Sequence, residues 1–264
     1  MTLAAARLRM AEPVTNLKRT FLPALVLAAA GMALLGNQLS AFAYTPGSTG
    51  YDISYPQCGG SYPSGAFGIV GVNGGYPFKY YNPCLADEVA HSSNTALYIN
   101  TGYDPLYTQV DGIHSTSQCV TQSASVTGTP SQQAAWAVGC SEASRSITYA
   151  TAQGVTNPSS WWLDVETANS WSSSDLSMNQ YTIQGIVDTL LRQSPAGVGI
   201  YSTHYQWNAV VGPLPVSGVL ADWVATGTTS LKRARRACGT AGFTGAPVWF
   251  VQYISGGFDT DYAC

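Results

Sequence analysis

Short apolar segments alternate with longer segments of mixed polarity along the chain. The short segments are rich in β-branched and aromatic residues and are bounded by Gly, Pro, Asn or Ser, which is typical of strands. They predict seven strands, at Gly50–Ser54, Phe67–Val72, Ala96–Asn100, Trp161–Glu166, Val198–Ser202, Val219–Ala225 and Val248–Tyr253. The intervening segments predict helices at Pro83–His91, Ser131–Gly154, Asn179–Gln193, Thr203–Val211 and Ser230–Cys238. The third of these helices is the clearest, because its apolar residues recur at the spacing of one buried face.

Apolar strands that alternate with helices indicate parallel β-α units and a sheet that is buried on both faces. We therefore expect an α/β fold, a modified TIM-type (β/α) barrel in which some helices are short or missing. A doubly wound open sheet is the competing topology. The stretch from Gly102 to Pro130 has no periodicity and is interpreted as a long insertion held by Cys119. In a barrel, functional side chains are expected at the carboxyl ends of the strands.

Residues 1–43 have the features of a secretory signal peptide. Four basic residues come first, Phe21–Leu35 form an uncharged apolar core, and Ala41-Phe42-Ala43 gives the A-x-A cleavage pattern. The core is shorter than the about 18–20 residues that span a bilayer, so a retained anchor is the less favoured alternative. We expect cleavage near Ala43, followed by secretion of residues 44–264 as a single domain without membrane contact.

All six cysteines lie in the predicted mature part. An even number in an exported chain without a Cys-x-x-Cys pair indicates disulfides rather than metal ligands. We prefer the pairing of sequence neighbours, which is Cys58–Cys84, Cys119–Cys140 and Cys238–Cys264. No metal or cofactor is expected.

Charge is sparse and mostly negative, at 9% charged residues and a net charge of −3 for the whole chain. Nucleic-acid binding requires a large basic surface and is therefore disfavoured. One exception is the segment Lys232-Arg233-Ala234-Arg235-Arg236. We interpret it as the solvated face of a short helix that starts after Ser230 and ends at Gly239.

The densest group of reactive side chains is Trp161-Trp162-Leu163-Asp164-Val165-Glu166. Side chains alternate along a strand, so Asp164 and Glu166 point to one side and the apolar residues between them to the other. Two carboxylates in a poorly solvated place repel, and one proton is then held tightly. Glycoside hydrolysis requires such a pair of acid and carboxylate. The alternatives are pairing with basic residues, which are scarce here, and a site for a hard cation.

Several further segments fall in one order with this motif: Asp52 and Gln57 near the first strand, Gly199-Ile200-Tyr201-Ser202, Ala221-Asp222-Trp223-Val224-Ala225, and Trp249-Phe250-Val251-Gln252-Tyr253 followed by an acid. In this order they resemble the lysozyme-type glycoside hydrolases of family 25, which cleave the glycan of bacterial peptidoglycan. The resemblance is greater still to the uncharacterised secreted relatives of that family. These share Asn73-Gly74-Gly75, Asn82-Pro83-Cys84 and the Trp-Trp-Leu-Asp-Val-Glu motif.

The resemblance implies a role for each acid. Glu166 matches the general acid, Asp164 the neighbouring carboxylate that stabilises the transition state or orients the acetamido group, and Asp52 the first-strand carboxylate. Asp259 matches the acid after the last strand, although Asp261 would serve equally. The implied activity is cleavage of a β-1,4 linkage in a cell-wall polysaccharide by a secreted, monomeric enzyme, with its stereochemistry left open.

Other residues are candidates for binding a sugar. We expect Trp171 and Trp207 to be exposed in a groove, where their rings would pack on sugar faces, and Tyr201 and Gln252 to bind substrate. Asn73 and Asn100 each follow an apolar strand, so they either bond substrate hydroxyls or form strand-ending turns.

Other functions stay open at this point. A non-catalytic wall-binding protein on the same scaffold is the main alternative, and chitin or another N-acetylated glycan is an alternative polymer. The basic segment at 232–236 also has a second interpretation, which is electrostatic binding of an anionic cell-wall polymer. No Gly-x-Ser-x-Gly, phosphate-loop or His-Glu-x-x-His motif is present, which argues against serine esterases, nucleotide enzymes and zinc proteases.

Overall fold

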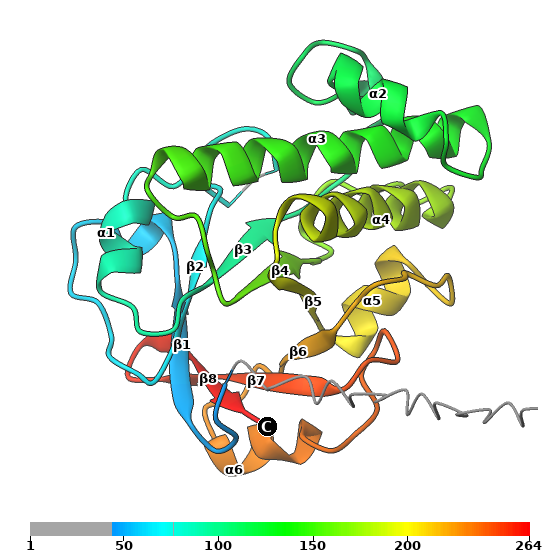
Figure 1. The fold of residues 1–264 in the computed structure, drawn as a ribbon. Helices are drawn as coiled ribbons and strands as arrows, with labels where there is room; N and C mark the ends of the chain where they lie inside the picture. The colour runs from blue at the N-terminus through cyan, green and yellow to red at the C-terminus, as the bar shows by residue number, and fades with distance from the viewer. Residues whose placement is uncertain (1–43, 76) are drawn as a thin grey trace, which may run out of the picture. The chain divides into compact units, whose positions relative to one another are not determined.

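Eight strands close into a barrel in chain order, as Figure 1 shows in ribbon form. The computed structural model describes residues 44–75 and 77–264; the predicted signal peptide and its cleavage site after Ala43 lie outside the described residues. The strands are β1 Thr49–Ile53, β2 Gly68–Gly71, β3 Ala96–Asn100, β4 Ser160–Asp164, β5 Gly197–Ser202, β6 Ala221–Ala225, β7 Val248–Ser255 and β8 Phe258–Ala263. The barrel prediction is therefore confirmed, and the open sheet is excluded.

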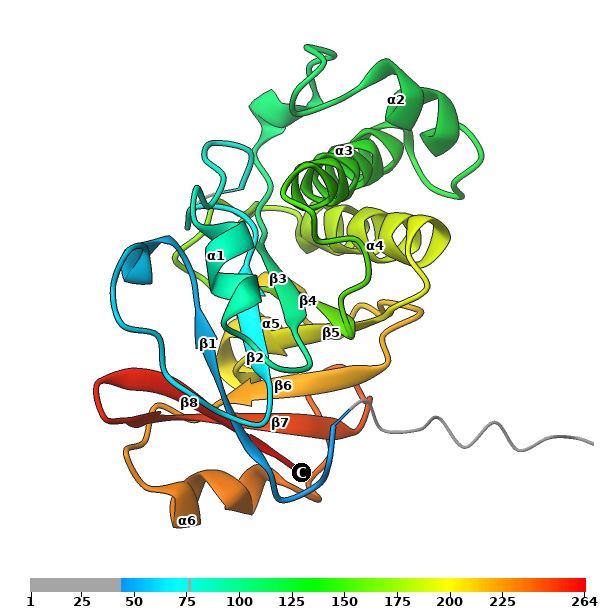
Figure 2. The same ribbon diagram turned by 60° about the vertical axis from the view of Figure 1, so that its left-hand side comes forward.

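The eighth strand departs from the parallel pattern that the sequence predicts. β1 to β7 pair in parallel, whereas β8 lies antiparallel between β7 and β1 and closes the barrel (Figure 2). A two-residue turn at Gly256 and Gly257, both with positive φ, joins β7 to β8. A Gly-Gly pair of this kind makes the tight hairpin turn that suits the strand twist. The prediction missed β8 because Asp259, Thr260 and Asp261 interrupt its apolar residues.

The helices are α1 Leu85–Ala90, α2 Ser117–Ser123, α3 Pro130–Ala152, α4 Leu176–Gln193, α5 His204–Val210 and α6 Leu231–Ala234. Only α3 and α4 are long, and a single 3₁₀ turn at Tyr55–Gln57 stands where a helix between β1 and β2 is expected. The Gly102–Pro130 stretch is held by Cys119 as predicted, through its disulfide to Cys140 of α3. It also contains the short helix α2, capped by Thr116, which its lack of periodicity did not indicate. Two helical turns are too short to give a periodic signal.

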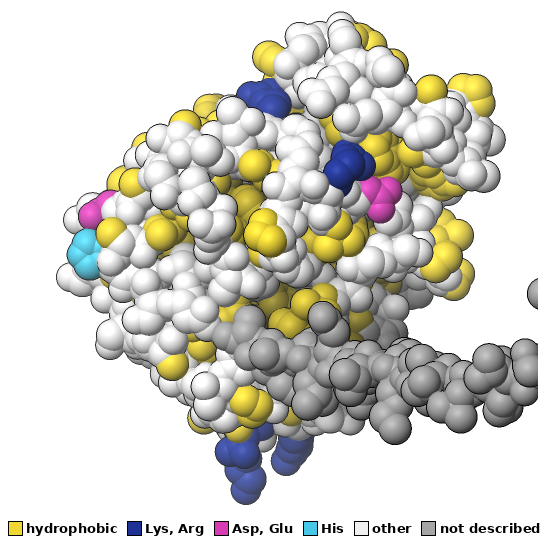
Figure 3. Space-filling model, in the orientation of Figure 1, with side chains coloured by type: hydrophobic (Ala, Val, Ile, Leu, Met, Phe, Trp, Pro, Cys, Tyr) yellow, Lys and Arg dark blue, Asp and Glu magenta, His cyan; other side chains and the backbone are white. Residues whose placement is uncertain are grey.

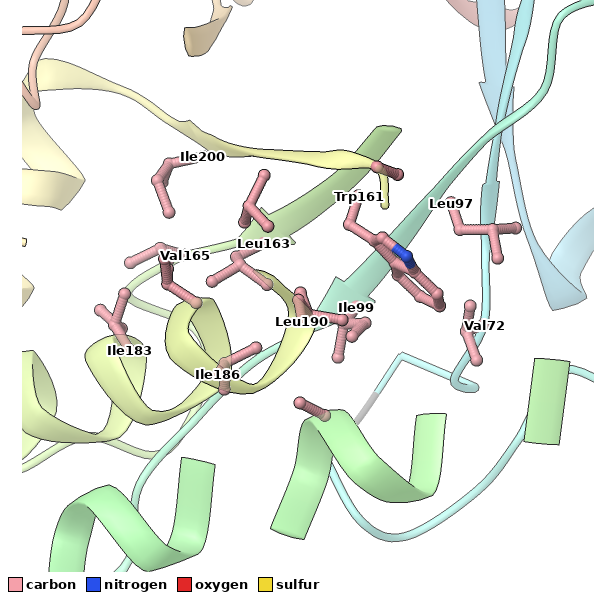
Figure 4. Packing of buried hydrophobic residues seen from close by; sticks show 14 of the residues in the cluster. Val72, Leu97, Ile99, Trp161, Leu163, Val165, Ile183, Ile186, Leu190 and Ile200 are labelled. Carbon is pink, nitrogen blue, oxygen red and sulfur yellow. The ribbon is translucent and has the colours of Figure 1, made fainter. Parts of the chain in front are cut away.

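β4 packs on both of its faces, against helices outside the barrel and against other strands inside it. Trp161, Leu163 and Val165 face outward, and Figure 4 shows the last two directed at Ile183 and Ile186 of α4. The intervening residue Trp162 faces into the barrel, in one cluster with Phe67, Ile69 and Phe250. This cluster fills the interior with side chains, so the polar side chains of the same inward faces are left toward the carboxyl ends of the strands.

The helices α3 and α4 approach each other through two glycines. A Cβ atom on Gly139 would overlap the carbonyl oxygen of Thr182, and one on Gly185 would overlap the carbonyl oxygen of Trp136. Contact of this kind brings the two backbones together without intervening side chains.

The three disulfides join Cys58 to Cys84, Cys119 to Cys140 and Cys238 to Cys264. All three predicted pairs are confirmed. The third ties the segment after α6 to Cys264, the residue that follows β8, and β8 is the strand that closes the barrel.

Candidate active site

A pocket of about 160 Å³ gathers acidic and aromatic side chains from the barrel strands. Its lining is Asp52, Tyr98, Asp164, Glu166, Tyr201, Trp223, Gln252 and Asp259. The sequence candidates Asp52, Asp164, Glu166 and Asp259 are thus brought together from positions more than 200 residues apart at the extremes. Tyr201 and Gln252 lie among them.

The acids of this pocket have no cationic partner. The ion pairs within 4.0 Å among the described residues join His91 to Asp87 and His114 to Asp111, and neither pair is near the pocket lining. The interpretation that Asp164 and Glu166 are paired with basic residues is therefore wrong. Within residues 44–75 and 77–264, no group of three or more His, Cys, Asp or Glu side chains is placed to hold a metal ion.

Asp164 ends β4 on the inward side of the strand. It is 8% exposed, and its Oδ2 accepts a 2.7 Å hydrogen bond from the amide Nδ2 of Asn100 at the end of β3. Burial, and then the negative charge of Glu166, raise the pKa of Asp164 well above its ordinary value. Both causes disfavour the charged form of Asp164, which therefore holds its proton more tightly than a free carboxyl group does.

Glu166 is partly buried and is held from two sides. Gln206 of α5 donates from Nε2 to its carboxylate at 3.3 Å and accepts from the backbone nitrogen of Thr167 at 2.7 Å. Trp171 donates from its indole nitrogen to the backbone carbonyl of Glu166 at 2.8 Å. Trp171 is half-buried and outside the pocket lining, so the structure places it as a support for Glu166 rather than in an open groove.

Asp52 is held across the barrel by β7. Gln252 donates to its Oδ2 at 2.9 Å, and Tyr201 in turn donates its hydroxyl to Gln252 Oε1 at 2.9 Å. Burial, and then the charge of Asp259, raise the pKa of Asp52 to about 7. The side-chain amide of Gln252 is thus held in one orientation by Asp52 of β1 and Tyr201 of β5. In that orientation the amide positions Asp52 at the pocket wall.

The two candidate acids of β8 take different positions. Asp259 lines the pocket, whereas Asp261 is completely buried and accepts a 2.7 Å hydrogen bond from the indole nitrogen of Trp223. Burial, followed by the negative charge of the neighbouring Asp52, raises the pKa of Asp261 well above its ordinary value. Asp261 is therefore a buried neighbour of Asp52 that favours its protonated form.

The raised pKa of Asp52 has a consequence for stability. The ordinary value is 3.8 and the folded value about 7, so at an intermediate pH the unfolded chain has released a proton that the folded chain keeps. The stability that Asp52 contributes is then present below about pH 4 and is lost as the pH rises through about 7. We expect the melting temperature to fall over this range and to fall less in an Asp52→Asn variant, as calorimetry across the range would show. Equal pH slopes for the two proteins would contradict it.

Two further sequence candidates lie outside the pocket lining, as Trp171 and Asn100 also do. Trp207 is only 5% exposed and packs against the ring of Phe243 in the core, so the expectation of an exposed ring is wrong. Asn73 is 1% exposed; its amide donates to the carbonyl of Asn100 at 2.8 Å and to Glu142 Oε1 at 3.3 Å, and its oxygen accepts from the Asn100 nitrogen. Asn73 thus fixes the end of β3 and is not open to a ligand.

Sequence reasoning missed Tyr98, Trp223 and Gln206. Tyr98 lies two residues before Asn100 on the same strand, so the alternation rule already placed it inward. Space for its ring comes from Gly71 of β2, where a Cβ would lie 2.7 Å from a Tyr98 ring carbon. Gln206 precedes Trp207, and no local pattern distinguishes which of the two faces Glu166.

Asn100 gives a direct test of how the pocket controls Asp164. The hydrogen bond from Asn100 lowers the pKa of Asp164, so an Asn100→Ala change should raise that pKa further. Titration of the carboxyl carbon by NMR would measure the shift. As a control, Asn169→Ala removes an amide that donates to the carbonyl of Thr101 and should leave Asp164 unchanged. An unaltered titration of Asp164 in the Asn100→Ala variant would contradict this assignment.

Comparison with known proteins supplies an independent view of the fold. A family model described as lysozyme-like protein 1 matches residues 107–224. The muramidase from Trichobolus zukalii is 17% identical, with 82% of this chain and 93% of that chain covered and a TM-score of 0.52. The bacterial lysozyme from Streptomyces coelicolor is 16% identical, with 83% and 93% covered and a TM-score of 0.50. The predicted resemblance to lysozyme-type glycoside hydrolases is confirmed at the level of the fold.

No curated protein is significantly similar in sequence to this chain. At identities below 20%, the structural likeness is one of fold. The matched stretch of the lysozyme-like family contains Asp164 and Glu166 and leaves out Asp52 and Asp259. The function must therefore be argued from the pocket itself.

Proposed function

We propose that this protein is a secreted glycoside hydrolase that cleaves a β-1,4 linkage of a bacterial cell-wall glycan. The observation that supports this most is the convergence of Asp52, Asp164, Glu166 and Asp259 on one pocket without a cationic partner. Hydrolysis of a glycosidic bond needs a proton donor and a second carboxyl group beside it. The lysozyme-like fold, shared with proteins described as a muramidase and a lysozyme, supports the choice of a cell-wall glycan.

In this proposal Glu166 is the general acid. It is the more exposed member of the Asp164–Glu166 pair, and the Gln206 amide orients its carboxyl group. Its proton passes to the glycosidic oxygen as the bond to the sugar carbon breaks. Asp164, buried and held by Asn100, orients the acetamido group in its protonated form or, as a carboxylate, stabilises the positive charge that develops on the sugar.

The rest of the pocket binds and orients the glycan. Tyr98 and Trp223 present aromatic walls, which suit the C–H faces of a sugar, while Tyr201 and Gln252 present polar groups. Asp52 and Asp259 complete the acidic rim opposite Asp164. Asp259 supplies a partly solvated carboxyl group on the pocket wall.

Export as a single domain of residues 44–264 is part of the proposal. Three disulfides are favoured in an oxidising compartment outside the cytoplasm, and Ala41-Phe42-Ala43 fits a signal-peptide cleavage site. No helix in the described part of the chain is long and apolar enough to span a membrane. We propose that the domain acts as a monomer on a polymeric substrate.

The test is digestion of purified peptidoglycan by the disulfide-bonded protein, with chitin as the comparison polymer. The expected result is release of soluble fragments with new reducing ends from peptidoglycan. If chitin alone is cleaved, the proposed substrate is wrong and the proposed reaction, glycoside hydrolysis, stands. If neither polymer is cleaved across about pH 4 to pH 8, the hydrolase proposal fails, and retention of the protein on the insoluble glycan would then support a non-catalytic binding protein.

A further inference from the structure

α6 and the 3₁₀ turn that follows it, Arg235–Ala237, have their charged residues on the solvent side and their apolar residues on the side that faces the domain. The four basic side chains, which we call the basic patch, are exposed: Lys232, Arg233, Arg235 and Arg236. Ala234 is fully buried, and Leu231 and Ala237 pack against the same cluster on the outside of β7. The interpretation of this segment as a short helix with a solvated face therefore describes its placement correctly.

The basic patch is presented by a rigid backbone. The nitrogens of Arg233 and Ala234 donate to the carbonyl of Ser230, which starts the helix, and the Cys238–Cys264 disulfide fixes its end to β8. The guanidinium of Arg235 lies 4.9 Å from the centre of the Tyr262 ring, a cation–π contact. Binding of a ligand to these side chains therefore costs little conformational entropy of the protein backbone.

Nothing in the described part of the protein neutralises the basic patch. The ion pairs found among residues 44–75 and 77–264 involve histidines and aspartates elsewhere. Figure 3 shows basic side chains projecting from the region where Figure 1 places α6. The patch holds four of the chain's eleven basic residues, while the whole chain has a net charge of −3. A polyanion is therefore attracted to this face.

Two classes of partner fit the basic patch poorly. An amphipathic helix that lies on a membrane needs an exposed apolar side, and the apolar residues of α6 are turned into the domain. Single-stranded nucleic acid is bound through aromatic platforms as well as charge, and the aromatic ring at this face, Tyr262, is covered by Arg235. What remains is a flexible polymer that is recognised through its charge alone.

We propose that the basic patch binds a phosphate-bearing anionic polymer of the cell wall. The choice of the wall as the source of the polymer rests on the proposed function. The patch also lies well for that function, because the loop that leads into α6 starts beside the pocket: the nitrogen of Thr226 donates to the carbonyl of Gln252 at 3.2 Å. A polymer held on α6 keeps neighbouring glycan at a high local concentration around the pocket.

The test measures binding to immobilised inorganic polyphosphate, and to bacterial cell walls before and after hydrofluoric acid removes their phosphate-bearing polymers. The neutral variant is Lys232→Gln/Arg233→Gln/Arg236→Gln, which spares Arg235 because Arg235 packs on Tyr262. Its matched control, Lys232→Arg/Arg233→Lys/Arg236→Lys, keeps every charge. We expect the neutral variant to lose affinity for polyphosphate about tenfold or more, with a salt slope smaller by about 2, and the control to bind as the wild type does.

Three outcomes would overturn the proposal. They are equal binding by the neutral variant and the wild type, wild-type binding to walls that is insensitive to removal of the phosphate polymers, and stronger binding to vesicles of anionic lipid than to polyphosphate. Failure of the hydrolase proposal is distinguishable, because a protein that cleaves no glycan can still bind polyphosphate. Conversely, the neutral variant should cleave soluble peptidoglycan fragments at the wild-type rate, since its changes lie outside the pocket.

Discussion

A Glu166→Gln variant should lower kcat for glycan cleavage by about 10²–10⁴-fold, which is the contribution of a positioned general acid. The change removes the proton that the glycosidic oxygen needs and keeps the shape of the side chain. An amide oxygen can still accept the hydrogen bond from Gln206, so the local structure and KM should change little. Steady-state release of reducing ends from soluble peptidoglycan fragments measures both constants.

The matched control for this variant is Asp87→Asn, which removes one carboxylate from the exposed surface of α1. It should leave kcat within about twofold of the wild-type value, because Asp87 lies outside the pocket lining. If the Glu166→Gln variant cleaves at the wild-type rate, Glu166 is not the general acid and another group has that role. Asp164, with its raised pKa, would be the next one to test.

Replacement of Gly139 by Ala should destabilise the domain by about 2–4 kcal/mol, as overpacking against a backbone does. Alanine favours a helix by about 1 kcal/mol over glycine, which would stabilise α3 in isolation. The added methyl group, however, meets the carbonyl oxygen of Thr182 in α4, and a backbone atom cannot turn aside as a side chain does. The two helices must separate, and the α4 face that covers β4 moves with them.

Thermal unfolding measures this effect, with an expected fall in Tm of about 5–12 °C for a domain of this size. Thr148→Ala is the control, because Thr148 is exposed on the same helix and its loss should change stability by about 0.5 kcal/mol or less. An unaltered or higher Tm for Gly139→Ala would show that α3 and α4 have room to adjust.

β4 was predictable from sequence because its local pattern and its tertiary role agree. Alternation alone placed Leu163 and Val165 against helices and left Asp164 and Glu166 on the opposite side. The same reasoning gave the barrel, since each parallel strand carries enough apolar surface to be recognised by itself. β8 carries too little, and the Gly256-Gly257 pair was its one usable signal.

The supports of the candidate site could not be predicted, because each joins distant parts of the chain. Glu142 of α3 contacts Asn73, 69 residues earlier, and Asn73 fixes the Asn100 that holds Asp164. On α5 the choice between Gln206 and Trp207 depends on how the helix docks on the barrel, which one residue of rotation reverses. Local sequence identifies the acids, whereas packing decides which neighbours hold them.

The pocket cannot form before the last strand, β8, has been synthesised. Asp52 is translated early, and the Gln252 that orients it follows 200 residues later, with Asp261 and the final strand later still. Until those residues are in place, Glu166 and Asp164 are present on a chain without a closed barrel and without a pocket. Under the proposed function, a cell that produces this protein is spared its action during synthesis and translocation. Under the same proposal, the pocket is complete only once β8 has entered the sheet, and the Cys238–Cys264 disulfide at its end is favoured in an oxidising compartment.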